Sequence, residues 1–169
     1  VAPIFLRNRI PNKKCTAADK KSIYLTNLIV ILLILLVSLV VGFKGFFMIQ
    51  IPIFFWASAI GSWLFYVQHQ FDPTYWKRHD QWCRIHASLQ GSSYYRLPSI
   101  LQWFTGNIGL HHIHHLDSRI PNYRLQRCLD DHADLLDVPA LTLPSSIQCA
   151  KLKLWDEQAQ RMVGFAAAR

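Results

Sequence analysis

Two long uncharged apolar runs constrain this chain more than any other feature of its sequence. Residues 25–41 and 46–68 contain no charged side chain, and the apolar character extends back to residue 23. A helix needs about 20 predominantly apolar residues to cross the hydrocarbon core of a bilayer. The segment from Gly42 to Gly45 separates the runs and predicts a turn. We therefore expect a transmembrane hairpin with spans at about 23–41 and 46–68, rather than a buried helix pair of a globular protein.

Basic residues lie on both sides of the predicted hairpin, whereas the predicted turn has only Lys44. The positive-inside rule therefore predicts that both flanks of the hairpin are cytoplasmic and that the turn lies on the opposite side of the membrane. The basic residues that support this orientation are Arg7, Arg9, Lys13, Lys14, Lys20 and Lys21 before the hairpin, and Lys77, Arg78, Arg84 and Arg96 after it.

The net charge of +8 and the isoelectric point of about 9.6 do not indicate a nucleic-acid-binding protein. The positive charges gather beside the predicted spans, where they also attract anionic lipid headgroups, and no nucleic-acid-binding motif is present. The four cysteines are widely spaced and form no CxxC pair. They therefore predict free thiols in a reducing compartment rather than a zinc site or a disulfide framework.

Four histidines occur within five positions at 111–115, in the order HHIHH. In a helix, His111 and His115 lie one turn apart on one face, and His114 borders the same face. Neutral imidazole is a common ligand for iron, zinc and copper, so these three residues are candidate metal ligands. The alternative is a solvated helix end or a pH-sensitive patch. His112 occupies the variable position of the HxxHH pattern, and we favour a role for it other than metal ligation.

The remaining patterns predict an all-α integral membrane protein. We expect a cytoplasmic connector over 1–22, the hairpin over 23–68, a cytoplasmic or interfacial histidine region over 69–135, and a helical tail over 136–169. Pro98 is expected to open a helix that runs to the histidine cluster, with apolar residues that favour the membrane surface. A second short helix is expected from Asn122 to about His132. In the tail, Leu152, Trp155, Ala159, Met162 and Val163 recur at helical spacing.

Several motifs together resemble the membrane fatty acid desaturase family, and the resemblance is strongest to acyl-lipid, omega-6-like sequences. They are QHQF at 68–71, DPTYW at 72–76, QGSSYYRLP at 90–98, LQWFTGNIG at 101–109, HHIHH at 111–115 and RIPNYRL at 119–125. LKLWDE at 152–157 and MVGF at 162–165 are similar to the C-terminal tail of that group. The HxxHH pattern alone is less specific, because related membrane hydroxylases and ketolases share it.

The resemblance implies an integral membrane enzyme with four spans in two hairpins and three histidine boxes at the cytoplasmic face. Such enzymes use two irons and dioxygen to introduce a double bond into an acyl chain, with electrons from a ferredoxin- or cytochrome-type donor. By resemblance, His111, His114 and His115 form the third box, and His69 is the additional histidine that approaches the metal. The alternative for His69 is an interfacial histidine without a ligand role.

Asn107 lies four residues before His111, which places it on the same face of the expected helix. It is a candidate partner for a ligand histidine, either directly or through water. The alternative is an ordinary capping or packing role.

The chain departs from the family pattern in one important respect. The first and second histidine boxes and the first hairpin are absent, since residues 1–68 contain no histidine. We therefore expect the chain to correspond to the C-terminal half of a desaturase, as a fragment or a truncated product, and to lack activity without the N-terminal half. The alternatives are part of a membrane hydroxylase or ketolase, and a non-catalytic membrane polypeptide that keeps the histidines.

Overall fold

The computed structural model describes residues 7–168, so the first six residues of the predicted connector lie outside the described part. The chain is mostly helical and divides into two compact units, one extending to Trp63 and the other starting at Leu64. The two long helices are α2 (Ala17–Val41) and α3 (Phe43–His69), and the end of α3 belongs to the second unit.

Both long helices meet the length and composition needed to cross a membrane. Their apolar side chains are exposed rather than buried, with Leu39 at 80% and Val40 at 81% exposure, and Ser38 is the only buried residue of α2. A helix whose apolar residues face outward all round is typical of a membrane span. The first unit therefore agrees with the predicted pair of apolar helices.

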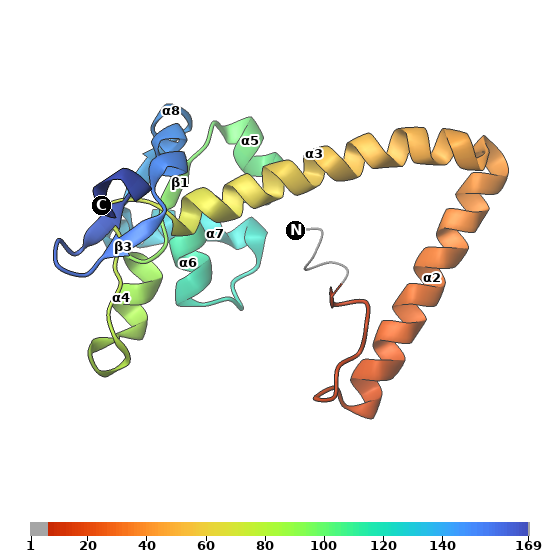
Figure 1. The fold of residues 1–169 in the computed structure, drawn as a ribbon, viewed down its shortest axis with the longest axis horizontal. Coiled ribbons are helices and arrows are strands. Elements are labelled where there is room, and N and C mark those ends of the chain that lie inside the picture. The colour runs from red at the N-terminus through yellow and green to blue at the C-terminus, as the bar shows by residue number, and fades with distance from the viewer. Residues whose placement is uncertain (1–6, 169) are drawn as a thin grey trace. The chain divides into compact units, whose positions relative to one another are not determined.

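The connection between α2 and α3 is shorter than the sequence predicted. Gly42, with φ of +75°, is the only residue between the helices, and α3 already begins at Phe43. Lys44 therefore lies in the first turn of α3 and is not part of a loop. Figure 1 shows the chain changing direction sharply at this point. Glycine adopts positive φ without steric cost, so one residue suffices for the turn.

Helix α2 also begins earlier than the predicted span. The backbone N–H of Asp19 donates to the Thr16 hydroxyl at 3.2 Å, and the Thr16 N–H donates to the Asp19 carboxylate at 2.9 Å. This reciprocal capping box satisfies the first backbone donors and starts the helix at Ala17. The end of the predicted connector is therefore helical.

The second unit combines short helices with four short strands (Figure 1). Its buried apolar core is formed by Leu110, Ile113, Leu125, Leu129 and Leu135. The parallel pair β1–β2 and the antiparallel pair β3–β4 form two separate small sheets. The elements are η1 (His79–Gln81), α4 (Arg84–Leu89), β1 (Tyr94–Arg96), α5 (Ser99–Phe104), α6 (His111–Leu116), α7 (Asn122–Asp131), η2 (Ala133–Leu136), β2 (Ala140–Thr142), α8 (Leu143–Ser146), η3 (Ile147–Lys151), β3 (Leu154–Asp156), β4 (Arg161–Val163) and η4 (Phe165–Ala168).

The short helix predicted after Pro121 is confirmed as α7, whereas the single helix predicted from Pro98 to the histidines is wrong. The structure has two helices instead, α5 and α6. Residues 105–110 separate them and include Gly106 and Asn107, which have φ of +62° and +59°. Two successive residues in the left-handed region end a helix, because the backbone cannot continue its hydrogen-bond ladder through them.

The helical tail predicted over 136–169 is wrong where Leu152, Trp155, Ala159, Met162 and Val163 recur, because this segment forms the β3–β4 hairpin. The Asp156 carboxylate accepts hydrogen bonds from the backbone N–H groups of Gln158 and Ala159 at 2.9 and 3.0 Å. Such local side-chain bonds stabilise a turn in place of a helix. Leu152 and Trp155 still lie at helical spacing in the sequence, but β pairing places Trp155 opposite Met162. The all-α expectation therefore holds for most of the chain but not for these strands.

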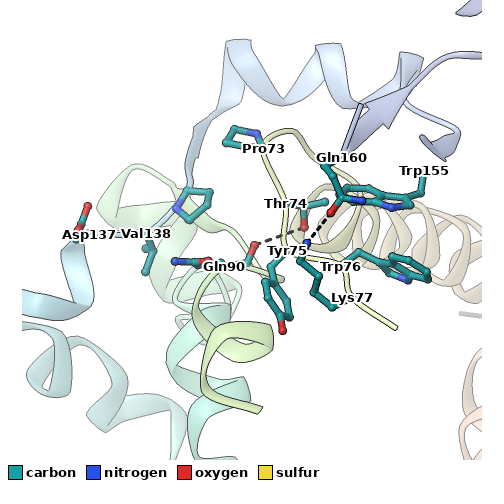
Figure 2. A pocket seen from close by; sticks show the side chains of 11 residues that line it. Pro73, Thr74, Tyr75, Trp76, Lys77, Gln90, Asp137, Val138, Trp155 and Gln160 are labelled. Carbon is teal, nitrogen blue, oxygen red and sulfur yellow. Dashed lines mark hydrogen bonds between the residues drawn. The ribbon is translucent and has the colours of Figure 1, made fainter. Parts of the chain in front are cut away.

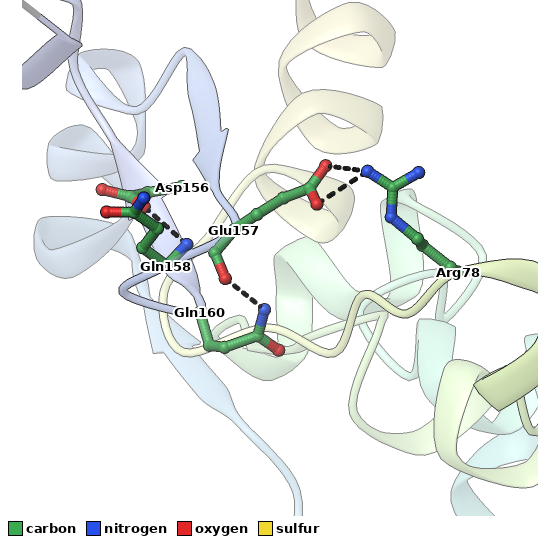
Figure 3. Close-up of polar contacts among 5 residues, drawn as sticks. All are labelled: Arg78, Asp156, Glu157, Gln158 and Gln160. Atoms are coloured by element: carbon green, nitrogen blue, oxygen red, sulfur yellow. Dashed lines mark hydrogen bonds and ion pairs between the residues drawn. The ribbon is translucent and has the colours of Figure 1, made fainter.

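The β3–β4 turn is joined to the segment that follows α3 (Figure 3). Nη2 of Arg78 lies 2.8 Å from both carboxylate oxygens of Glu157, and Gln160 donates to the Glu157 carbonyl at 2.7 Å. The Arg78 and Glu157 side chains are 70% and 51% exposed. An exposed ion pair of this kind contributes at most about 1 kcal/mol, so it orients the turn more than it stabilises the fold.

Candidate metal centre

His69, His111 and His115 gather at one point in the second unit. The Nε2 atom of His111 lies 3.0 Å from Nε2 of His69 and 3.0 Å from Nε2 of His115. The candidate ligand atoms of these three residues all lie within 4.8 Å of one another. The helix α6 places His111 and His115 one turn apart, as the sequence predicted, and His69 comes from the last residue of α3.

This arrangement fits a metal ion better than a network of hydrogen bonds. Each imidazole nitrogen offers either one proton or one lone pair, so Nε2 of His111 cannot form ordinary hydrogen bonds with both neighbours. Three imidazole nitrogens gathered within 4.8 Å of one another are a donor set that first-row transition metals bind. The site contains no carboxylate among these ligands, and its donors are all neutral.

The protein environment favours the unprotonated form of the candidate ligands His111 and His115. Burial, followed by the neighbouring histidines His115, His69, His114 and His112, lowers the pKa of His111 to about 3. Burial and the neighbouring His114 also lower the pKa of His115. Metal ligation requires the neutral imidazole, so these shifts prepare both residues for binding. His111 is buried and its Nδ1 atom has no hydrogen-bond partner among residues 7–168.

His114 does not join the three converging nitrogens. Its ring stacks on that of His111 with a centroid distance of 5.7 Å, and its side chain is half-buried. His114 is therefore adjacent to the candidate metal centre, but it is not one of the three histidines whose nitrogens lie close together.

His112 follows His111 in α6 and is fully buried. Its Nε2 lies 3.1 Å from the carbonyl oxygen of Leu135 and donates a hydrogen bond to it. Burial lowers the pKa of His112 to about 4, which keeps this ring neutral. These contacts give His112 a packing role, and its expected non-ligand role stays a prediction.

Among the described residues, the side chain of Asn107 hydrogen-bonds to Asn122 and not to a candidate ligand, and its expected role through water stays a prediction. It lies in the left-handed turn rather than on a helix shared with His111. Its amide Nδ2 donates to the carbonyl oxygen of Asn122 at 2.9 Å. The side chain thus anchors the α5–α6 turn to the start of α7, which is the packing alternative.

Hydrogen bonds from buried side chains hold the two ligand-bearing segments in place. Gln68 is 1% exposed, and its Nε2 donates to the carbonyl oxygen of Ile108 at 2.6 Å. Ser93 donates from its backbone N–H to the carbonyl of Gln68 at 3.0 Å and from its hydroxyl to the carbonyl of Val67 at 3.2 Å. These bonds satisfy carbonyls at the end of α3, which an isolated helix leaves without partners.

Side chains of α4 also hydrogen-bond to helix α6. The Ser88 hydroxyl donates to the carbonyl oxygen of His115 at 3.1 Å, and Nη2 of Arg84 donates to the carbonyl of Leu116 at 3.2 Å. Sequence reasoning missed Gln68, Ser88 and Ser93, because their contacts join segments far apart in the chain. Gln68 belongs to the QHQF motif and Ser93 to the QGSSYYRLP motif, but the partners of their side chains were not visible in the sequence.

A separate pocket of about 530 Å³ also lies in the second unit. Figure 2 shows Lys77 directed towards Gln160, whose Oε1 accepts a hydrogen bond from Nζ of Lys77 at 2.6 Å. The rings of Trp76 and Trp155 lie beside this pair with a centroid distance of 5.8 Å. None of the candidate metal ligands lines this pocket. Its lining consists of Pro73, Thr74, Tyr75, Trp76, Lys77, Gln90, Asp137, Val138, Pro139, Trp155 and Gln160.

Comparison with known proteins gives two matches. Residues 2–142 match the family model described as fatty acid desaturase. The chain is also 40% identical over 172 residues to a protein of Bacillus subtilis (strain 168) named "Fatty acid desaturase". That match covers 100% of this chain and 49% of the relative, so the chain spans about half the length of the curated relative. No solved structure matches the chain significantly.

Proposed function

Because the chain belongs to the fatty acid desaturase family, we propose that it supplies one part of a membrane enzyme that introduces a double bond into an acyl chain. The convergence of His69, His111 and His115 is the observation that supports this proposal most directly. The overall reaction removes one hydrogen from each of two adjacent methylenes and reduces dioxygen to two waters. The balance requires two further electrons and protons, which come from a ferredoxin- or cytochrome-type donor.

Iron is the metal we assign to the site, with His69, His111 and His115 as its ligands in this chain. An unactivated C–H bond is too strong for acid–base chemistry, and bound iron supplies the oxidising chemistry that such a bond requires. The neutral charge of the three imidazoles suits a metal that cycles through higher oxidation states. By family resemblance, His114 is a fourth ligand, and it takes this role together with residues outside this chain.

The position of His69 also indicates the membrane depth at which the acyl chain reacts. His69 is the last residue of α3, so the metal centre lies at the end of a proposed membrane span. An acyl chain that remains among the lipid tails reaches this depth without leaving the membrane. Phe65 packs against His69 with a ring centroid distance of 4.7 Å, and it presents an apolar surface on the membrane side of the ligand.

We propose that α2 and α3 cross the membrane as a hairpin and that both flanks are cytoplasmic. The exposure of their apolar side chains supports membrane insertion. The basic residues on both flanks, with only Lys44 near the turn, support the orientation. This topology places the histidine centre on the cytoplasmic side, where a soluble electron donor has access.

Residues 1–169 alone are proposed to be inactive. A site with two irons and about four protein ligands for each needs roughly eight ligands, whereas this chain offers four. The histidine boxes that the family has in its N-terminal part do not occur in residues 1–68, which contain no histidine. The catalytic unit therefore requires the other half of the family's ligand set.

A hybrid protein tests this function. Residues 1–169 would replace the matching stretch of the Bacillus subtilis relative, and the hybrid desaturase would be produced in cells that lack a desaturase of their own. Gas chromatography of total fatty acids should detect an unsaturated product. The hybrid with His111→Ala and residues 1–169 alone should both give none. Product from residues 1–169 alone, or an equal yield from the His111→Ala hybrid, would contradict the proposal.

A further inference from the structure

Helix α5 presents apolar side chains outward and a polar side chain inward. Ile100, Trp103 and Phe104 are 65%, 74% and 71% exposed, whereas Gln102 is only 8% exposed. A helix on the surface of a water-soluble protein shows the opposite pattern, with its apolar face towards the core. The three exposed side chains, together with Leu101 at 39% exposure, form a contiguous apolar surface on a six-residue helix.

Exposure of this apolar surface to water is energetically unfavourable. Burial of a large apolar side chain away from water is favourable, and contiguous exposed apolar patches mark interaction sites. Trp103 and Phe104 stand edge to face with a centroid distance of 5.0 Å. Tryptophan is enriched at the boundary between lipid and water.

The position of α5 in the fold is fixed by the end of α3. The loop that contains α5 is closed at its base by a hydrogen bond from the Tyr95 N–H to the Gly109 carbonyl at 2.8 Å. Beside this bond, Gln68 of α3 donates to the Ile108 carbonyl at 2.6 Å. Helix α5 therefore leaves and rejoins the fold at the last turn of α3, which is the depth at which the proposed span ends.

The charges of the segment are also consistent with a lipid surface. Residues 91–116 contain no Asp or Glu, and Arg96 is their only Lys or Arg. Arg96 is exposed and lies just before α5, with its guanidinium 5.5 Å from the Tyr94 ring centroid. An arginine at this place keeps its charge among lipid headgroups while the following apolar residues enter the hydrocarbon.

We propose that α5 is an interfacial anchor whose exposed face, formed by Ile100, Trp103 and Phe104, inserts into the lipid bilayer beside the end of α3. This inference rests on the proposed membrane insertion of α2 and α3. The loop then leads through Gly109 and Leu110 directly into His111, so the anchor sets the depth of the metal ligands relative to the membrane. A lipid tail at this boundary therefore contacts α5 as it approaches the histidines from the bilayer.

Environment-sensitive probes on single cysteines test this placement in lipid nanodiscs. The background is the full chain with Cys15, Cys83 and Cys128 changed to Ser and the buried Cys149 retained, and the same background without an added cysteine is the blank. A nitrobenzoxadiazole label is attached to Ile100→Cys and, independently, to Phe104→Cys. Phe55→Cys in α3 is the control for insertion of the span, and Gln126→Cys on the polar helix α7 is the control for water exposure. Quenching is measured with phosphatidylcholine brominated either near the glycerol backbone or near the chain ends.

The proposal predicts that the probes at Ile100 and Phe104 emit at shorter wavelength than the Gln126 probe. Lipid brominated near the glycerol backbone should quench both of them strongly. The Phe55 probe should be quenched most by lipid brominated near the chain ends. Quenched Phe55 with unquenched α5 probes would overturn the anchor, and a blue-shifted but unquenched α5 probe would show a protein contact instead. An unquenched Phe55 probe would contradict the membrane span itself, and the anchor would fall with it.

Discussion

The Nε2 atoms of His69 and His111 lie 3.0 Å apart, although the two residues are 42 positions apart in the chain. One residue ends a long apolar helix and the other begins the short helix α6. The relationship therefore links the proposed membrane span to the histidine cluster directly. It depends on the segments that hold these two histidines together.

Gln68→Ala should destabilise the second unit by about 1–3 kcal/mol, because it removes a buried hydrogen-bond donor and leaves the Ile108 carbonyl without its partner. Denaturant unfolding in detergent micelles, followed by circular dichroism, measures this change. Gln70→Ala is the matched control, since Gln70 makes only a 3.4 Å contact with Leu152 and is half-buried. Its effect should stay within about 0.5 kcal/mol. Equal losses from both variants would contradict the role assigned to Gln68.

Gly109→Ala should cost about 1–3 kcal/mol of stability through overpacking. A Cβ atom at Gly109 would collide with the backbone oxygen of Tyr95 and with the Gln102 side chain. Gly45→Ala provides the contrast, because its nearest neighbour, Cβ of Val41, would lie at an ordinary 3.8 Å. The Gly45 variant should unfold at the same denaturant concentration as the parent or higher. If the Gly109 variant did the same, the close packing beside His111 would be disproved.

His114→Ala should show that His114 and His115 contribute differently to metal binding. Because His114 lies outside the three converging nitrogens, Co²⁺ binding by residues 1–169 should change little in this variant and fall strongly in His115→Ala. In the hybrid desaturase, His114→Ala should lower the iron content, since the resemblance assigns His114 to the complete site. Visible absorption of bound Co²⁺ measures binding by residues 1–169, and elemental analysis measures the iron content of the hybrid. Equal loss of Co²⁺ in both variants would contradict the geometric distinction.

Cys149 should react with iodoacetamide much more slowly than Cys83 in the folded protein. Its side chain is 3% exposed, and burial raises the pKa of the Cys149 thiol. A raised pKa lowers the fraction of reactive thiolate at neutral pH, and burial also limits access. The carbonyl of Cys149 accepts a hydrogen bond from the Tyr66 hydroxyl at 3.1 Å, so protection of the thiol reports docking of η3 on α3. Mass spectrometry of alkylated peptides gives both rates, and similar rates would argue against this packing.

Local sequence patterns were sufficient to predict the two long helices and the arrangement of two histidines on α6. The uncharged runs located α2 and α3, and the spacing of His111 and His115 placed both residues on one face of α6. The first prediction depends on the length and uncharged composition of the runs and the second on the helical repeat, and tertiary contacts overrode neither. By contrast, the meeting of His69 with these residues was implied by family resemblance and not by any local pattern.

The errors have a common physical origin in side-chain contacts that periodicity ignores. Asn107 adopts a left-handed backbone conformation and bonds to Asn122, which divides the expected helix into α5 and α6. Asp156 bonds to the backbone two and three residues ahead, which converts an apparently helical stripe into the β3–β4 hairpin. Asn and Asp compete with helices in this way because their short polar side chains reach nearby backbone groups.

The iron content of the hybrid desaturase tests the central claim most directly. We expect about two irons per chain in the parent and in the His86→Ala control, since His86 lies outside the cluster. The single variants His69→Ala, His111→Ala and His115→Ala should each lose at least about half of this iron, because each removes one of the three converging donors. Full iron content in all three variants would contradict the assignment of these histidines as the metal centre.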